Sequence, residues 1–114
     1  MQKPRNTLRL ITADAQPANL SSNDARAIVR EIAQDSARIA LVLGHAKMRA
    51  TQRGISLEDI QRVLLRGVVT EGPYIAAKSG WWRLNVTGQS AGAQITSVVE
   101  IEWATRLLVV TVMK

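Results

Sequence analysis

The sequence predicts an α+β domain, because the spacing of its apolar residues changes at Gly67. Before Gly67, apolar residues recur about every 3.6 positions, as on the buried side of amphipathic helices. After Gly67 they alternate with polar residues, as in strands that bury one face. Short links between these strands favour an antiparallel meander. We therefore expect N-terminal helices packed on a curved antiparallel β-sheet.

The first helix is predicted over residues 23–34, behind N-cap candidates at residues 21–24. Its apolar stripe comprises Ala25, Ile28, Val29, Ile32 and Ala33. Residues 36–54 fit two alternatives, a short strand followed by a helix that begins near His45, or a longer helical face. In both, Gly54 ends the helix as a left-handed cap.

Another helix is predicted from Ser56, which forms a variant capping box with Asp59. Gly67 ends this helix. Its buried stripe is expected to hold Leu57, Ile60, Val63 and Leu64.

The strands follow Gly67, and residues 7–12 fit an additional short strand near the N-terminus. A strand around Trp82 has its polar side at Arg83 and Asn85. A loop over residues 88–92 then leads into a strand with a buried face of Ile95, Val99, Ile101 and Trp103. The stretch 107–113 is apolar on both faces, which predicts a central strand.

A single domain is expected from 114 residues. We expect residues 1–20 to include a flexible N-terminal segment, 21–67 to be mainly helical and 68–114 to form the sheet. No apolar run approaches the roughly 20 residues of a membrane span, so a cytoplasmic protein without a membrane partner is expected. Cysteine is absent, which excludes disulfides and thiolate chemistry.

The charge balance is basic. Fifteen Lys and Arg face nine Asp and Glu, which leaves a net charge of +6, and most of the cations are arginine. The planar donor fork of arginine suits phosphate, so a polyanionic partner such as RNA is favoured. The alternative is a surface that is merely basic.

His45 is the only histidine, and therefore the only side chain that titrates near neutrality without help. The chain has no metal-ligand spacing, no nucleophile elbow and no Gly-rich phosphate loop, so we expect no metal and no cofactor.

His45, Arg49 and Arg53 are spaced by four and share one helical face. Metal-independent RNA cleavage needs an acid or base and cations around the phosphate. The pattern therefore predicts His45 as a catalytic residue and the two arginines as phosphate-binding residues. The alternative is a histidine that packs near the helix start, beside arginines on a solvated face.

Arg83 is the second catalytic candidate. It follows Trp81 on the polar side of its strand, and together they form a basic and aromatic surface suited to stacking a base. Trp81 is thus a binding candidate. The alternative is that Trp81 covers the flank of a helix while Arg83 pairs with Glu100 or Glu102 across the sheet.

The segment Glu71-Gly72-Pro73-Tyr74 is interpreted as a compact turn. Its carboxylate and phenol are further acid/base candidates. Turn chemistry, with the ring of Tyr74 packed, is the simpler interpretation.

Several short motifs in this order resemble an uncharacterised bacterial family, a domain of unknown function sometimes grouped with RelE/BrnT-like toxins. The resemblance covers roughly residues 22–113. It is carried by His45-Ala46-x-x-Arg49, Arg53-Gly54-Ile55, Gly67, Glu71-Gly72-Pro73-Tyr74, Gly80-x-Trp82-Arg83 and Val110-Thr111-Val112.

The resemblance implies helices on a curved antiparallel sheet of the RelE/barnase type, RNA as substrate and an antitoxin protein as partner. It also implies that Thr111 on the last strand is a binding residue. The chain departs from the family pattern at Ala50, where a Met is usual, and at Leu43-Gly44, where a polar residue often precedes the histidine.

The leading hypothesis is a small basic RNA-binding domain of toxin type, acting as a metal-independent endoribonuclease. The alternatives are a non-catalytic module that binds protein or nucleic acid, and a structural homo-oligomer in which the long apolar C-terminal strand and the paired tryptophans meet across a dimer edge.

Overall fold

The structure, a computed structural model, describes residues 15–42, 44–103 and 105–114. The strand predicted at residues 7–12 lies outside these ranges. The described helical elements are α2 (Ser22–Ala33), the 3-10 turn η1 (Ser36–Arg38), α3 (His45–Arg53) and α4 (Leu57–Arg66). The strands are β1 (Ile39–Leu41), β2 (Val68–Ile75), β3 (Trp82–Ser90), β4 (Ala93–Glu102) and β5 (Arg106–Met113). The predicted α+β class is confirmed.

The five strands form one sheet in the order β1-β5-β4-β3-β2. The predicted antiparallel meander is confirmed for β2 to β5. The short β1 adds a parallel pair, with Ile39 opposite Leu107, so the sheet is mixed. The ambiguous stretch 36–54 therefore resolves into a strand followed by a helix.

The predicted central position of β5 is also confirmed, because β5 lies between β1 and β4. Beyond β1, its outer side meets α3, where Arg53 Nη1 donates to the Val112 carbonyl over 3.1 Å. Within the fold, one side of β5 thus meets β1 and Arg53 and the other meets β4. A dimer contact through this strand stays a prediction. The outer strand at the other side of the sheet is β2.

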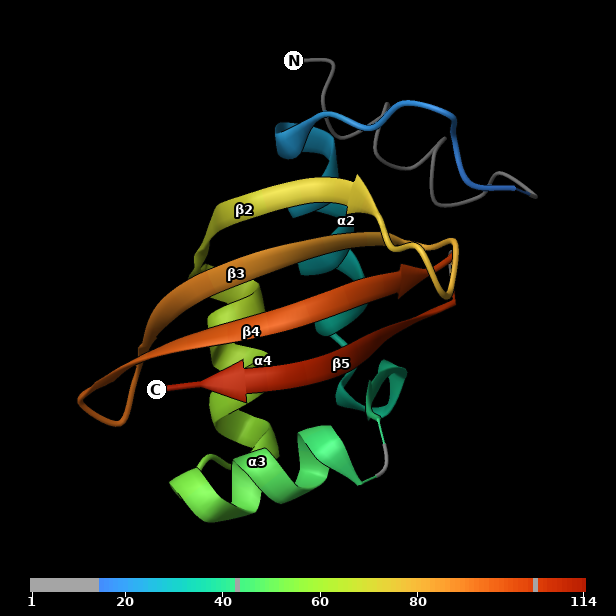
Figure 1. The fold of residues 1–114 in the computed structure, drawn as a ribbon. Helices are drawn as coiled ribbons and strands as arrows, with labels where there is room; N and C mark the ends of the chain where they lie inside the picture. The colour runs from blue at the N-terminus through green and yellow to red at the C-terminus, as the bar shows by residue number, and fades with distance from the viewer. Residues whose placement is uncertain (1–14, 43, 104) are drawn as a thin grey trace.

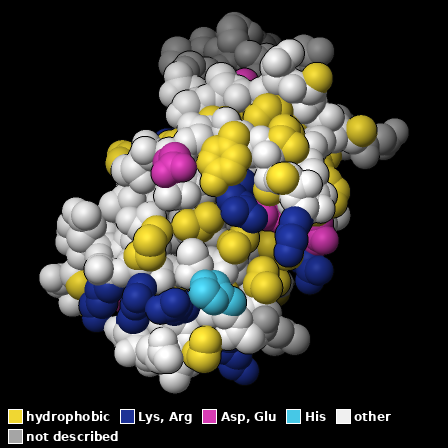
Figure 2. Space-filling model, in the orientation of Figure 1, with side chains coloured by type: hydrophobic (Ala, Val, Ile, Leu, Met, Phe, Trp, Pro, Cys, Tyr) yellow, Lys and Arg dark blue, Asp and Glu magenta, His cyan; other side chains and the backbone are white. Residues whose placement is uncertain are grey.

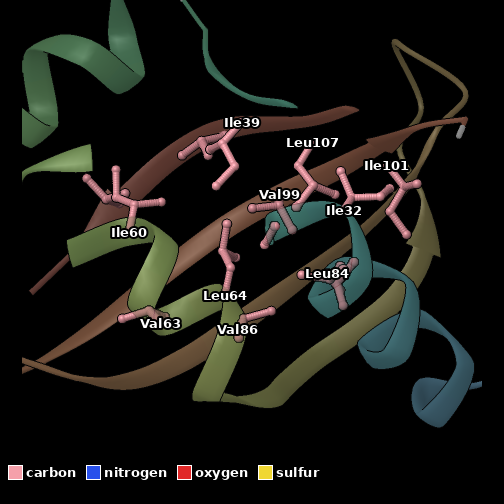
Figure 3. Close-up of a cluster of buried hydrophobic side chains, with 14 of the residues drawn as sticks. Ile32, Ile39, Ile60, Val63, Leu64, Leu84, Val86, Val99, Ile101 and Leu107 are labelled. Atoms are coloured by element: carbon pink, nitrogen blue, oxygen red, sulfur yellow. The ribbon is translucent and has the colours of Figure 1, made fainter. Parts of the chain in front are cut away.

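The helices α2 and α4 lie side by side against one face of the sheet (Figure 1). Between them and the strands lies the hydrophobic core, in which α4 supplies Ile60, Val63 and Leu64 (Figure 3). These side chains meet an inward row from the strands that includes Leu84, Val86, Val99, Ile101 and Leu107. Polar residues alternate with this row, so they project to the opposite face of the sheet.

Two local expectations are corrected by the structure. Leu57 is 42% exposed and lies outside the buried stripe, because it is the first residue of α4 and precedes the turn that packs on the sheet. Glu71 to Tyr74 form no compact turn and instead continue β2. The strand accommodates Gly72-Pro73 through register shifts on either side of Glu71.

The end of α4 approaches β3 very closely. A Cβ atom on Gly67 would lie 2.6 Å from the Thr87 carbonyl oxygen and 2.6 Å from that of Val63. A Cβ on Gly88 would likewise lie 3.2 Å from the Gly67 Cα. Two glycines in contact thus let the backbones pack without an intervening side chain, and Arg26 of α2 also donates to the Gly67 carbonyl.

The start of α4 is fixed by a polar network to the hairpin between β3 and β4. The predicted capping box of Ser56 and Asp59 is confirmed, with Asp59 Oδ2 accepting from the Ser56 amide at 2.9 Å. Ser90 donates to Asp59 Oδ1 at 2.6 Å and accepts from Arg62 Nη1. The Ser90 hydroxyl, followed by the Ser56 donors, lowers the pKa of Asp59 from 3.8 to about 2.

We expect Asp59→Asn to destabilise the protein by about 1 to 2 kcal/mol at neutral pH. Because the pKa of Asp59 is lower in the folded state, its contribution is complete above pH 4 and is lost as the pH falls towards 2. Urea unfolding as a function of pH measures this difference. Asp24→Asn is a matched control, since Asp24 lies in the first turn of α2 without the Ser90 contact. A wild-type advantage that persists unchanged to pH 2 would contradict the assignment.

Candidate functional site

The open face of the sheet is the side opposite α2 and α4, and no described helix covers it (Figure 1). One cross-strand row on this face runs Tyr74, Arg83, Glu100 and Leu108, from β2 to β5. A charged pair thus lies at the middle of the sheet, between an aromatic and an aliphatic side chain.

Arg83 and Glu100 form an ion pair within this row. Arg83 Nε donates to Glu100 Oε2 at 2.9 Å, and Nη2 donates to the same oxygen. The Glu100 side chain is only 5% exposed, whereas that of Arg83 is 29% exposed. Hydrogen bonding to Glu100 raises the pKa of Arg83, and Tyr74 acts in the same direction. The cross-strand pairing considered as an alternative for Arg83 is therefore confirmed.

A second row carries Thr111 on β5, Val98 on β4 and Asn85 on β3. Next to it, the hydroxyls of Thr70, Thr87 and Thr96 form a ladder across three strands. The Oγ1 atoms of Thr70 and Thr87 are 2.9 Å apart, and those of Thr87 and Thr96 are 2.8 Å apart. Uncharged polar groups therefore occupy this part of the open face, next to Glu71 of β2, which lies opposite Asn85.

Cations border the open face along α3. His45 is exposed at the first position of this helix, Arg49 and Arg53 follow at spacings of four, and Lys114 donates to the Arg53 carbonyl at 3.1 Å. We call these four residues the α3 basic row. Figure 2 shows Lys and Arg side chains (blue) in a line that ends at the histidine (cyan), below the sheet. The predicted left-handed cap at Gly54 ends the helix, with φ 65°.

The predicted site residues thus fall into two groups. His45, Arg49 and Arg53 lie on α3, beside β5, while Arg83 lies on β3, with β4 and β5 between. Thr111 lies on β5, between these groups. Trp81 precedes β3, is partly buried and packs against the hydrophobic core.

Most arginines of the described chain make internal bonds. Arg26, Arg30, Arg38 and Arg53 donate to backbone carbonyls at Gly67, Leu65, Thr105 and Val112. Three others contact acidic or hydroxyl groups, namely Arg62, Arg83 and Arg106. The arginine fork therefore joins elements of this fold as well as contributing surface charge.

Tyr74 is the side chain whose position the sequence did not predict. It lies opposite Arg83 and is 39% exposed, although the interpretation as a turn suggested a packed ring. Its place on the open face follows from the register shifts in β2, which no hydrophobic period reveals.

Two features are absent from the part of the chain that the structure describes, a metal site and a membrane-spanning helix. No group of three or more His, Asp or Glu side chains is arranged to hold a metal ion there. None of the helices in that part of the chain is long and apolar enough to cross a membrane.

Helices on one face of a meander, with a polar open face, define a small α+β domain with one exposed sheet surface. Residues 42–114 match the family described as Domain of unknown function (DUF4258), which is more than half of the chain. The chain belongs to this family, so the resemblance to an uncharacterised domain family is confirmed. The comparisons with curated proteins and with solved structures give no match.

We expect Arg83→Met to destabilise the protein by about 3 kcal/mol, because Glu100 is left as a buried, unpaired carboxylate. The double variant Arg83→Met/Glu100→Leu should recover most of this loss, since Leu108 and Val98 offer apolar neighbours. Urea unfolding of both variants measures the difference. A double variant as unstable as the single one would show that the charge pair itself holds the sheet together.

Proposed function

We propose that this domain binds RNA on its open face and along the α3 basic row. The observation that carries the proposal is the cationic line of Arg49, Arg53 and Lys114 beside a sheet face that presents Tyr74 and Arg83. Cations bind phosphates without regard to sequence, while aromatic and polar groups on a sheet contact bases. The net charge of +6 supports the same class of partner.

Arg83 is suited to binding an anion even though it is paired. A guanidinium has five N–H donors, and Glu100 receives bonds from Nε and Nη2 only. The remaining donors, on a side chain that is 29% exposed, have a fixed direction because Glu100 holds the group. A fixed donor loses less conformational entropy on binding than a mobile one.

We further propose that the bound RNA is cleaved without a metal ion, with His45 as the acid/base group. A phosphate held by Arg49 would lie one helical turn from His45, since residues spaced by four are neighbours on a helix surface. Removing the 2′-hydroxyl proton lets that oxygen attack phosphorus, and the 5′-oxygen leaves as it gains a proton. His45 would transfer one of these protons, a water molecule would transfer the other, and Arg49 would stabilise charge on the phosphorane.

The toxin role and the antitoxin partner rest on the resemblance to toxin-grouped families, and both belong to this proposal. A non-catalytic binding module is the second candidate function. It is favoured by the distance in the fold between His45 on α3 and Arg83 on β3, which leaves two strands between the two catalytic candidates.

RNA affinity is expected to fall with salt, with a log–log slope of about 0.7 for each phosphate contact. Arg49→Gln and Lys114→Gln should each weaken binding and reduce this slope by about 0.7. Fluorescence anisotropy with a labelled RNA in a salt series measures both quantities. Arg66→Gln removes the same charge from an exposed position on α4, on the other side of the sheet, and should leave the slope unchanged. Equal effects of all three variants would contradict a specific phosphate-binding row.

His45→Ala is expected to abolish RNA cleavage in EDTA while leaving folding intact, because His45 is an exposed residue at a helix start. The measurement is gel analysis of total RNA incubated with wild type and variant, with the unfolding midpoint recorded for both. Cleavage by both proteins would contradict the role of His45. Retained RNA binding without cleavage by either would overturn the catalytic proposal and favour the binding module.

A further inference from the structure

The cations near the open face are unevenly distributed. The α3 basic row provides Arg49, Arg53 and Lys114 along one border of the sheet. At the centre, the charge of Arg83 is balanced by Glu100 within hydrogen-bonding distance. The rest of the face carries the threonine ladder, Asn85 with Glu71 opposite it, an ion pair of Arg106 with Glu102, and apolar side chains. Phosphate is therefore attracted to the border of the face more strongly than to its centre.

This distribution favours one nucleic-acid strand over two. A duplex presents phosphates along both edges of its grooves, so a duplex lying on the sheet would bring phosphates against Glu100 and Glu71 as well as against α3. A single strand has one backbone, which can follow the α3 basic row while its unpaired bases lie over the sheet. Stacking on the faces of the bases needs no cation, and hydroxyl and amide groups form hydrogen bonds with the base edges.

Tyr74 offers a surface for one such base. Tyr74 is 39% exposed, and it lies opposite Arg83 in the pairing of β2 with β3. An exposed ring opposite a guanidinium is a suitable stacking surface.

The threonine ladder provides polar contacts next to this surface. Thr70, Thr87 and Thr96 each have a hydroxyl that both donates and accepts, and their chain of contacts leaves further capacity at its two ends. Asn85 lies between the ladder and the Arg83–Glu100 pair along β3. These groups suit the edges of unpaired bases and ribose hydroxyls, and none of them selects for phosphate.

We infer that the site takes single-stranded RNA, with its backbone on the α3 basic row, its bases over the sheet and one base stacked on Tyr74. This inference rests on the proposed RNA-binding function and specifies its substrate class. Arg83 would contact the stacked nucleotide, while Glu100 acts as a positioning residue that fixes the guanidinium.

The test compares labelled single-stranded RNA with a hairpin duplex of the same composition, at matched salt, by fluorescence anisotropy. We expect the single strand to bind at least about tenfold more tightly, the scale of one stacked base. Tyr74→Leu should weaken binding of the single strand by about tenfold and leave duplex binding unchanged. Tyr74→Phe keeps the ring and should retain most of the affinity.

The outcomes distinguish a failure of the single-strand inference from a failure of the proposed RNA binding. Equal binding of both RNA forms, with Tyr74→Leu neutral, would overturn the single-strand inference while RNA binding itself stands. A preference for the duplex would also overturn it. No binding of either form at low salt would overturn the proposed function. Because Tyr74 is exposed, both variants are expected to fold, and their unfolding midpoints and circular dichroism verify this.

Discussion

The contact between the end of α4 and β3 is the constraint on which the arrangement of the protein depends. Gly67 and Gly88 bring the two backbones so close that a single Cβ on Gly67 would collide with carbonyl oxygens of Thr87 and Val63. At the other end of α4, Asp59 and Ser90 join the helix to the hairpin of β3 and β4. Two fixed points set the direction of α4 across the sheet. Its apolar stripe then covers one face, and the polar residues that alternate with the core must lie on the other.

The positive charge of the chain has two distinct uses. Several arginines join elements through carbonyl oxygens, as Arg26 does at Gly67 and Arg30 at Leu65. Such bonds satisfy acceptors at the end of α4 that the helix cannot satisfy itself. The net charge calculated from the composition therefore overstates the number of cations that are available to bind a polyanion. Of the described cations near the open face, Arg83 and Arg106 are paired with Glu100 and Glu102, whereas Arg49 and Lys114 lie beside the sheet near α3.

Features that depend on near neighbours in the chain could be predicted from the sequence. Ser56 with Asp59, Gly54 and the apolar stripe of α2 are local signals, and the structure contains each of them. Features that depend on distant strands could not. The parallel pairing of β1 with β5 has no local signature, because three residues of strand carry too little pattern. Leu57 has the spacing of a core residue but lies one turn too early to reach the sheet.

The same limit applies to the candidate site, where contacts between strands could not be predicted from the sequence. The sequence identified Arg83 and offered Glu100 among its partners, because alternation predicts which residues share a face. It could not choose between Glu100 and Glu102, since that choice depends on the register between β3 and β4. The position of Tyr74 could not be predicted from the sequence either, because two register shifts in β2 decide which side chain lies opposite Arg83. One residue of slippage moves a side chain to the other face of a sheet.

The ion pair at the centre of the open face is informative because an apolar pair is expected to replace it with little loss of stability. A well-packed apolar pair is often as stabilising as a buried ion pair, and Val98 and Leu108 already provide apolar surroundings. Glu100 is almost wholly buried, whereas Arg83 remains partly exposed, and this arrangement has a consequence other than stability. Glu100 holds the guanidinium through Nε and Nη2, opposite Tyr74 in the strand pairing, and leaves the group partly exposed. In the proposed RNA-binding role, a guanidinium held in this way would lose less conformational entropy on binding than a mobile one.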